Sequence, residues 1–134
     1  MRLIARLSAL LAALFLLGGQ ANAQNDGFEV FIPISKYIAQ GDSESLSAWF
    51  AGSLEMAVLA ESSDCSRSQA KQIMKTFFDA HTPHSFEITH TAGRGNMKYA
   101  LGNLSAGGET FLVTVFVSCK KGSYLIQQLK IERR

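Results

Sequence analysis

The clearest pattern of apolar and polar positions lies in Ser66–Ala80. Apolar side chains recur there at spacings of three and four, which lays one stripe along a helix: Ala70, Ile73, Met74, Phe77 and Phe78. Ser66 and Gln69 have the spacing of a capping box, in which each side chain satisfies a free backbone N–H of the first turn. Proline disfavours helical backbone in the residue before it, so Pro83 ends the segment. We predict one long amphipathic helix here.

Two shorter helices are expected before it. Phe28–Ala39 carries apolar residues at helical spacing, and Gly41 is the kind of residue that commonly follows a helix C-terminus. Asp42 or Ser43 can cap a second helix, Ser43–Phe50, because a short polar side chain accepts a hydrogen bond from the first turn. These two segments predict an N-terminal helical hairpin.

Alternation of apolar and polar residues with period two marks the rest of the chain. It predicts five strands, at Ser53–Glu61, Ser85–Ala92, Met97–Leu104, Thr110–Cys119 and Tyr124–Glu132. Glycine-containing turns separate the last four strands, as antiparallel hairpins require. The order α-α-β-α-β-β-β-β predicts a single α+β domain, in which a bent antiparallel sheet wraps the long helix.

The alternation also divides the strand side chains between two faces of the sheet. On the face toward the helix, we expect a pocket lined by the side chains of His90, Tyr99, Tyr124 and Gln128. The other face is expected to carry Leu112, Phe116, Leu125 and Leu129. If no helix covers that second face, these four residues form an apolar patch suited to a homodimer.

Residues 1–23 have the pattern of a cleaved signal peptide. Arg2 and Arg6 precede the apolar run 7–17, and Ala21-Asn22-Ala23 offers a small-x-small cleavage site. The run is shorter than the roughly 20 residues that span a bilayer. We therefore expect an exported protein, periplasmic or secreted, with a single domain at residues 24–134 and no membrane span after cleavage.

The charge of the chain excludes one class of partner. The full sequence has 13 Lys and Arg residues against 11 Asp and Glu residues, and removal of Arg2 and Arg6 with the signal peptide makes the two numbers equal. A neutral domain lacks the basic surface that nucleic-acid binders need. We therefore expect no nucleic-acid partner.

The two cysteines, Cys65 and Cys119, both follow the cleavage site. In an exported protein a pair of cysteines is more often bridged than free, so a disulfide is the first expectation. The alternative is a reactive thiol. Cys65 lies just before a helix N-terminus, where the helix dipole lowers the pKa of a thiol.

Four segments carry a resemblance to a known family. They are Gln69-Ala70 with Ile73 and Phe77-Phe78, then Ser85-Phe86-Glu87-Ile88, Lys98–Gly102 and Tyr124–Leu129. The stretch from Ile34 to Ile131 resembles the secreted domain-of-unknown-function family 4783. The element order resembles the cystatin-like, nuclear transport factor 2-like α+β cone. This resemblance implies a pocket at the wide end of the cone and brings no catalytic set, because the superfold hosts many unrelated activities.

The candidate site consists of residues expected inside the cone: Trp49, Met56, Phe77, His90, Tyr99, Phe111, Tyr124 and Gln128. Such residues can line a cavity for a small apolar ligand, and they also fit a closed apolar core. No metal site is expected, because His81, His84 and His90 lack the spacing of zinc ligands. No cofactor is indicated.

We therefore predict a non-catalytic binding module for a small apolar ligand or a protein partner. The alternative, which the cone-fold resemblance implies, is a small pocket enzyme of isomerase or dehydratase type with His90, Tyr99 or Asp79 as acid or base. Against it, no strand position expected to face inward holds a carboxylate. The third interpretation is a thiol-dependent protein that uses Cys65.

Overall fold

The computed structural model describes residues 27–134, so the predicted signal peptide at residues 1–23 lies outside the described part. The helical elements are the short turn η1 (Phe28–Val30) and helices α2 (Phe31–Gln40), α3 (Ser43–Ser47) and α4 (Arg67–Ala80). The strands are β1 (Phe50–Val58), β2 (Glu61–Ser66), β3 (Pro83–Arg94), β4 (Met97–Ala106), β5 (Glu109–Lys120) and β6 (Ser123–Arg133). The predicted α+β class is confirmed.

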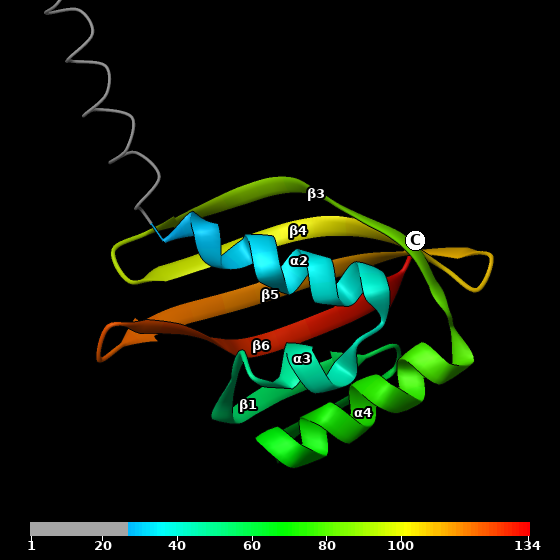
Figure 1. Ribbon diagram of the computed structural model, residues 1–134, viewed down its shortest axis with the longest axis horizontal. Helices are drawn as coiled ribbons and strands as arrows, with labels where there is room; N and C mark the ends of the chain where they lie inside the picture. Colours follow the sequence, from blue (N-terminus) through cyan, green and yellow to red (C-terminus); the bar gives the residue numbers. More distant parts are fainter. Residues whose placement is uncertain (1–26) are drawn as a thin grey trace, which may run out of the picture.

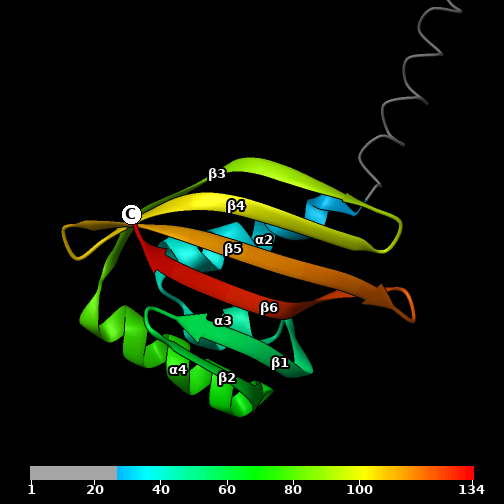
Figure 2. The same ribbon diagram turned by 180° about the vertical axis from the view of Figure 1, so that it is seen from behind.

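The six strands form one curved sheet in the order β2-β1-β6-β5-β4-β3. Neighbouring strands are antiparallel except β1 and β6, which are parallel. Figure 1 shows α2 lying across one face of the sheet, with α3 and α4 beside β1. On the opposite side of β3–β6 no described helix covers the strands (Figure 2), and we call this side the open face. The core therefore lies between the helices and the covered face.

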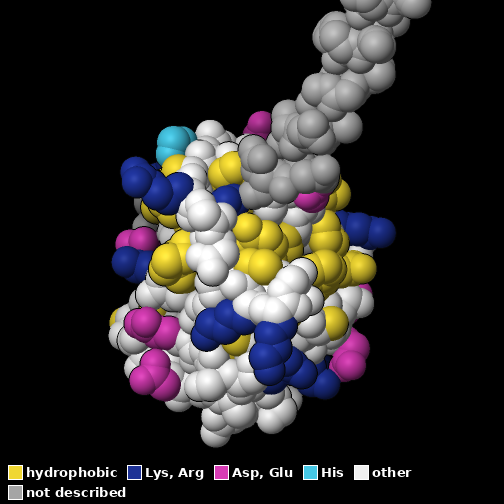
Figure 3. Space-filling model, turned by 90° about the vertical axis from the view of Figure 1, so that its left-hand side faces the viewer, with side chains coloured by type: hydrophobic (Ala, Val, Ile, Leu, Met, Phe, Trp, Pro, Cys, Tyr) yellow, Lys and Arg dark blue, Asp and Glu magenta, His cyan; other side chains and the backbone are white. Residues whose placement is uncertain are grey.

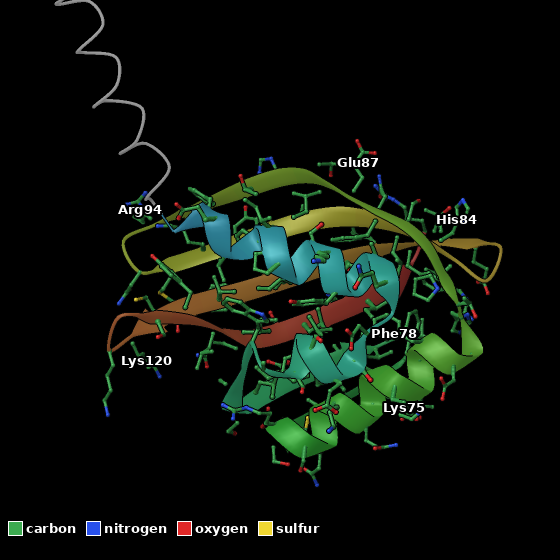
Figure 4. All side chains as sticks on the ribbon, in the orientation of Figure 1. Lys75, Phe78, His84, Glu87, Arg94 and Lys120 are labelled. Carbon is green, nitrogen blue, oxygen red and sulfur yellow. The ribbon has the colours of Figure 1, made fainter. Side chains whose placement is uncertain are left out.

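Helix α4 forms where the sequence predicts it. Ser66 Oγ accepts a hydrogen bond from the Gln69 N–H at 3.2 Å, and Gln69 Oε1 accepts one from the Ser66 N–H at 2.8 Å, which completes the capping box. The buried residues of the predicted stripe are Ala70, Met74, Phe77 and Phe78. Figure 4 shows Phe78 on the side of α4 that faces the fold and Lys75 on the outer side. Tertiary packing of this apolar face is what stabilises a helix of this length.

The second helix ends earlier than predicted. Asp42 caps α3 by accepting a hydrogen bond from the Ser45 N–H at 3.0 Å, and this bond lowers the pKa of the Asp42 carboxyl. The helix stops at Ser47 instead of continuing to Phe50, whose backbone already belongs to β1. Phe50 pairs with Ile126 of β6, and its side chain is fully buried in the core.

Strand β2 is an element that the pattern does not predict. Its sequence, ESSDCS, is polar except for Cys65, as is common for a short strand at a sheet edge. The turn that leads into it is Leu59-Ala60, without the glycine, asparagine or aspartate typical of two-residue hairpins. Leu59 has a φ of 58°, a left-handed conformation that costs a non-glycine residue roughly 1–2 kcal/mol. Pattern analysis misses β2 because both of its usual signals are absent.

A β-bulge in β3 moves one predicted pocket residue to the other face. Ile88 pairs with Gly102, whereas His90 pairs with Leu101, so Thr89 is an extra residue without its own partner. A bulge of this kind shifts the alternation of faces by one residue. His90 therefore lies on the open face, not on the face of Ile88 as predicted.

A second bulge in β6 has the same effect near the C-terminus. Gln128 pairs with Phe116, and Ile126 pairs with Val117, the residue after Phe116. Gln127 is therefore the extra residue in β6. Gln128, predicted to face the pocket, consequently lies on the open face. Leu129, predicted on the open face, is instead fully buried in the core.

Tyr99 lies on the open face as well, contrary to the prediction. The covered face of β4 carries small side chains at Ala100, Gly102 and Ala106. A Cβ atom at Gly102 would lie 2.6 Å from the ring of Phe86, so this position has no room for a side chain. Lys98 and Leu104 are buried on this face as well, so the strict alternation along β4, and not side-chain size, places Tyr99 on the open face.

The two cysteines are not bridged, which corrects the predicted disulfide. Cys65 lies in β2 and Cys119 in β5, with β1 and β6 between these strands, and both thiols are free. Three strand spacings amount to roughly 14 Å, about twice the Cα–Cα distance that a disulfide can span. Burial raises the pKa of the Cys65 thiol and Asp64 raises it further, which does not support an activated nucleophile at this position.

Replacing Ser66 by alanine removes the side-chain acceptor for the Gln69 N–H. We expect Ser66→Ala to lower the free energy of unfolding by about 1 kcal/mol, measured by urea denaturation. Ser62→Ala, at an exposed position in β2, is the control and should lower it by less than about 0.5 kcal/mol. Equal stability of the two variants would contradict the capping role.

Protein denatured without reductant should contain two thiols per chain that react with dithionitrobenzoate. In the folded protein, partly exposed Cys119 should react faster than buried Cys65, whose raised pKa leaves less thiolate at neutral pH. Cys119→Ser should remove the fast phase of the thiol reaction, and Cys65→Ser should remove the slow phase. Denatured wild-type protein without reactive thiols would show that a bridge does form.

Candidate functional site

A cavity of about 560 Å³ lies between α4 and the β1–β2 hairpin. Its floor is formed by Met56 and Phe77, which are both buried. The other lining residues are Val58, Leu59, Ala60, Glu61, Ser63, Gln72, Ile73, Thr76, Ala80 and His81. Both the volume and the mixture of many apolar with a few polar groups are typical of small-ligand sites.

The hairpin contributes to the cavity through alternate residues. Met56 pairs with Ser63 and Val58 with Glu61, so these four side chains share the face of the hairpin that looks toward α4. The turn residue Leu59 extends the wall, and its N–H donates a hydrogen bond to the Ile131 carbonyl at 2.8 Å. Left-handed backbone at a leucine is uncommon, and such strain is often found at functional sites.

Helix α4 contributes two rows of side chains. Residues four apart in a helix lie on the same side, so one row runs through Ile73, Phe77 and His81, and the neighbouring row through Gln72 and Thr76. The first row is mostly apolar and the second is polar. The helix side of the cavity therefore carries an apolar row beside a polar row.

His81 closes the cavity at the C-terminal end of α4. Its ring centroid lies 4.8 Å from that of Phe77 and 5.2 Å from that of Phe111, and the side chain is only 16% exposed. His81 Nδ1 lies 3.7 Å from Glu109 Oε2. Glu109 Oε1 in turn accepts a hydrogen bond from Arg133 Nε at 2.8 Å. With Nδ1 turned toward Glu109, Nε2 is the ring nitrogen left for a ligand.

His81 is the cavity residue that sequence reasoning misses. The sequence analysis considers it only as one of three histidines unsuited to a metal. Its spacing of four from Phe77 is a signal that could have placed it, because it continues the row of α4 that lines the cavity. Its contact with Glu109 of β5 joins residues far apart in the chain and has no local signal.

The structure places the eight predicted pocket residues in four different parts of the fold. Met56 and Phe77 line the cavity, and Phe111 is in the core against His81. Trp49 and Tyr124 line a second hollow, which is described below, and His90, Tyr99 and Gln128 lie on the open face. The prediction of a single shared pocket for all eight therefore does not describe this fold.

The residues of the predicted enzymatic alternative do not form one acid–base set. His90 and Tyr99 are neighbours on the open face, with ring centroids 6.2 Å apart. Asp79 is exposed on α4 and pairs with Lys75 at 3.2 Å. A general base must lie within hydrogen-bonding reach of its substrate, and no described cavity is lined by any two of these three groups.

The second hollow, of about 530 Å³, lies at the end of the molecule shown in Figure 3, where hydrophobic side chains gather beside Lys and Arg. Trp49 and Tyr124 form part of its wall. Close to Tyr124, the buried Lys98 donates a hydrogen bond from Nζ to the Gly95 carbonyl at 2.6 Å. This hollow also borders Gly27, the first described residue, whereas the α4 cavity, which is open to solvent on one side, is lined by described residues well inside the chain. We therefore take the α4 cavity as the candidate site.

Within residues 27–134, no three or more His, Cys, Asp or Glu side chains come together as a metal site requires. His84 and Glu87 project from the outer edge of β3 (Figure 4), away from the cavity. Among the described helices, none is long and apolar enough to cross a membrane.

Solved structures share this fold. A DUF4783 family protein from Bacteroides ovatus has a TM-score of 0.74 at 21% identity, over 77% of this chain and 94% of that chain. A second, from Bacteroides uniformis, has a TM-score of 0.73 at 22% identity, over 76% and 94%. A putative dehydratase from the NTF2-like family of Streptomyces avermitilis has a TM-score of 0.62 at 10% identity, over 83% and 98%. At these identities the likeness shows the fold alone.

The sequence comparisons separate family from function. None of the curated proteins compared with this sequence matches it. The family model described as "Domain of unknown function (DUF4783)" matches residues 31–132, which is nearly all of the described chain. The NTF2-like fold and the family expected from the four sequence segments are thus both confirmed, and the chain belongs to the DUF4783 family.

Proposed function

We propose that this protein binds a small apolar ligand in the cavity between α4 and the β1–β2 hairpin. The observation that carries the proposal is a space of about 560 Å³ with buried Met56 and Phe77 as its floor. The cavity opens to solvent past exposed lining residues, so water reaches its apolar floor. An apolar ligand of matching shape removes that apolar surface from water, which favours binding.

Three of the polar groups that line the cavity suit recognition of a ligand. Gln72, Thr76 and Ser63 can each donate and accept a hydrogen bond, which orients a ligand without reacting with it. The acid–base residues predicted from the sequence lie elsewhere. The binding module is therefore non-catalytic, and the signal peptide predicted at residues 1–23 assigns it to an exported protein, periplasmic or secreted.

A second copy of this chain is the proposed protein partner. The open face carries apolar side chains that are only partly buried and that no described helix covers: Tyr99, Leu101, Leu112, Phe116 and Leu125. Leu112 and Phe116 lie on the same strand, β5, near the middle of the sheet. An apolar face of this kind pairs with the same face of a second copy across a two-fold axis, without needing complementary charges.

Thr76→Trp tests the location of the ligand, because it projects an indole into the cavity from an exposed position of α4. We expect it to weaken binding of the neutral fluorescent probe N-phenyl-1-naphthylamine by about tenfold or more, measured by fluorescence titration. Lys75→Trp adds the same side chain on the outer side of α4 and should keep wild-type affinity. Thermal melting checks that both variants fold. Equal affinity of the two variants for the probe would contradict this location.

Phe116→Lys tests the homodimer, because it places a charge in the middle of the open face. Burying an unpaired ammonium in an apolar interface is unfavourable, so this variant should elute as a monomer where the wild type elutes as a dimer. Light scattering coupled to size-exclusion chromatography measures the mass. Gln40→Lys, at an exposed position of α2 on the covered side of the sheet, is the control and should remain dimeric. A monomeric wild type would remove the homodimer from the proposal.

A further inference from the structure

Among the described residues that line the α4 cavity, the Asp, Glu, Lys and Arg side chains are represented by Glu61 alone, and this has a consequence for the ligand. Glu61 lies at the rim with an exposed side chain, and no Lys or Arg is among the lining residues. The guanidinium of Arg133 is bound at 2.8 Å to Glu109, the carboxylate beside His81. A ligand that enters this cavity meets a carboxylate and no cation to neutralise an acidic group.

His81 adds a hydrogen-bond acceptor at the C-terminal end of α4, the end of the cavity where β2 begins with Glu61. Packing against Phe77 and Phe111 holds its ring, and the carboxylate of Glu109 lies on the Nδ1 side. A carboxylate on that side favours the tautomer with the proton on Nδ1, which leaves a lone pair on Nε2. In this tautomer Nε2 can accept a hydrogen bond from a ligand's N–H or O–H group.

The shape of the cavity sets the size of the ligand. Its helix wall runs from Gln72 to His81, about 13 Å at 1.5 Å per residue. That length fits a medium alkyl chain or a body of three aromatic rings. The floor of Met56 and Phe77 is apolar, so the polar part of such a ligand belongs at the rim or at His81.

We propose that the α4 cavity selects neutral or cationic amphiphiles with an N–H or O–H donor, and rejects anionic amphiphiles such as fatty acids. This inference rests on the proposed function, since it assigns the chemical class of the ligand in the same cavity. Rejection arises because an anion loses its hydration on entry, finds no cation there and faces Glu61. The donor group of an accepted ligand replaces its lost hydrogen bonds at His81 Nε2 or at Glu61.

Two probes with the same aromatic body test this selection. N-phenyl-1-naphthylamine is neutral and carries an N–H donor, and 8-anilino-1-naphthalenesulfonate is the same molecule with an added sulfonate. We expect the wild-type protein to bind the neutral probe at least about tenfold more tightly than the sulfonate probe. Thr76→Trp must weaken the binding that is measured, so that it is assigned to this cavity.

The Glu61→Lys variant reverses the charge at the rim and should strengthen binding of the sulfonate probe by about tenfold. Glu55→Lys makes the same change in β1, at a residue paired with Gln128 and therefore on the open face, and should leave both affinities unchanged. His81→Phe keeps an aromatic ring but removes the hydrogen-bond acceptor, so it should weaken binding of the neutral probe several-fold. His84→Phe, at an exposed histidine of β3, is its control.

The outcomes separate the two proposals. If neither probe binds, or if Thr76→Trp changes nothing, the proposed ligand cavity fails. If both probes bind in the cavity with equal affinity, the cavity stands and the charge selection is overturned. Equal effects of Glu61→Lys and Glu55→Lys on the sulfonate probe would also overturn it, since the rim carboxylate would then have no special role.

Discussion

The contact between Phe77 and Phe111 decides how the long helix lies on the sheet. The two rings meet edge to face with centroids 5.2 Å apart, which joins the C-terminal end of α4 to β5. The capping box at Ser66 fixes the other end of the helix beside β2. Because both ends are held, α4 does not close onto the β1–β2 hairpin, and the cavity is the space that remains. His81 packs on the same two rings, so the polar end of the cavity depends on this contact as well.

The elements with local signals are predictable from the sequence, and the details that depend on distant pairing are not. The stripe and capping box of α4 and the alternation of β4 and β5 are visible in consecutive residues. The bulges at Thr89 and Gln127 are not, because either residue could continue a regular strand, yet each reverses the faces that follow. The same limit applies to the site. Met56 and Phe77 are predictable as buried residues of regular elements, whereas the position of His81 beside Glu109 appears only in the fold.

The fold and the site carry different information about function. The NTF2-like sheet is shared with structures at low identity, which include a putative dehydratase, and so it does not choose between binding and catalysis. The cavity argues for binding because its floor is apolar and its strained turn residue, Leu59, holds one wall in place. Backbone strain lowers stability, and proteins commonly retain it where function requires it.

The most direct test of the cavity is an NMR titration of the ¹⁵N-labelled protein, purified from cells that express the full chain, with N-phenyl-1-naphthylamine. Our account predicts that the largest amide shift changes map to Ile73, Thr76 and His81 on α4 and to the facing β1–β2 hairpin. Shift changes centred on Trp49 and Tyr124 would place the ligand in the second hollow instead. That result, or the absence of any saturable change, would contradict the central claim that α4 and the hairpin form a ligand site.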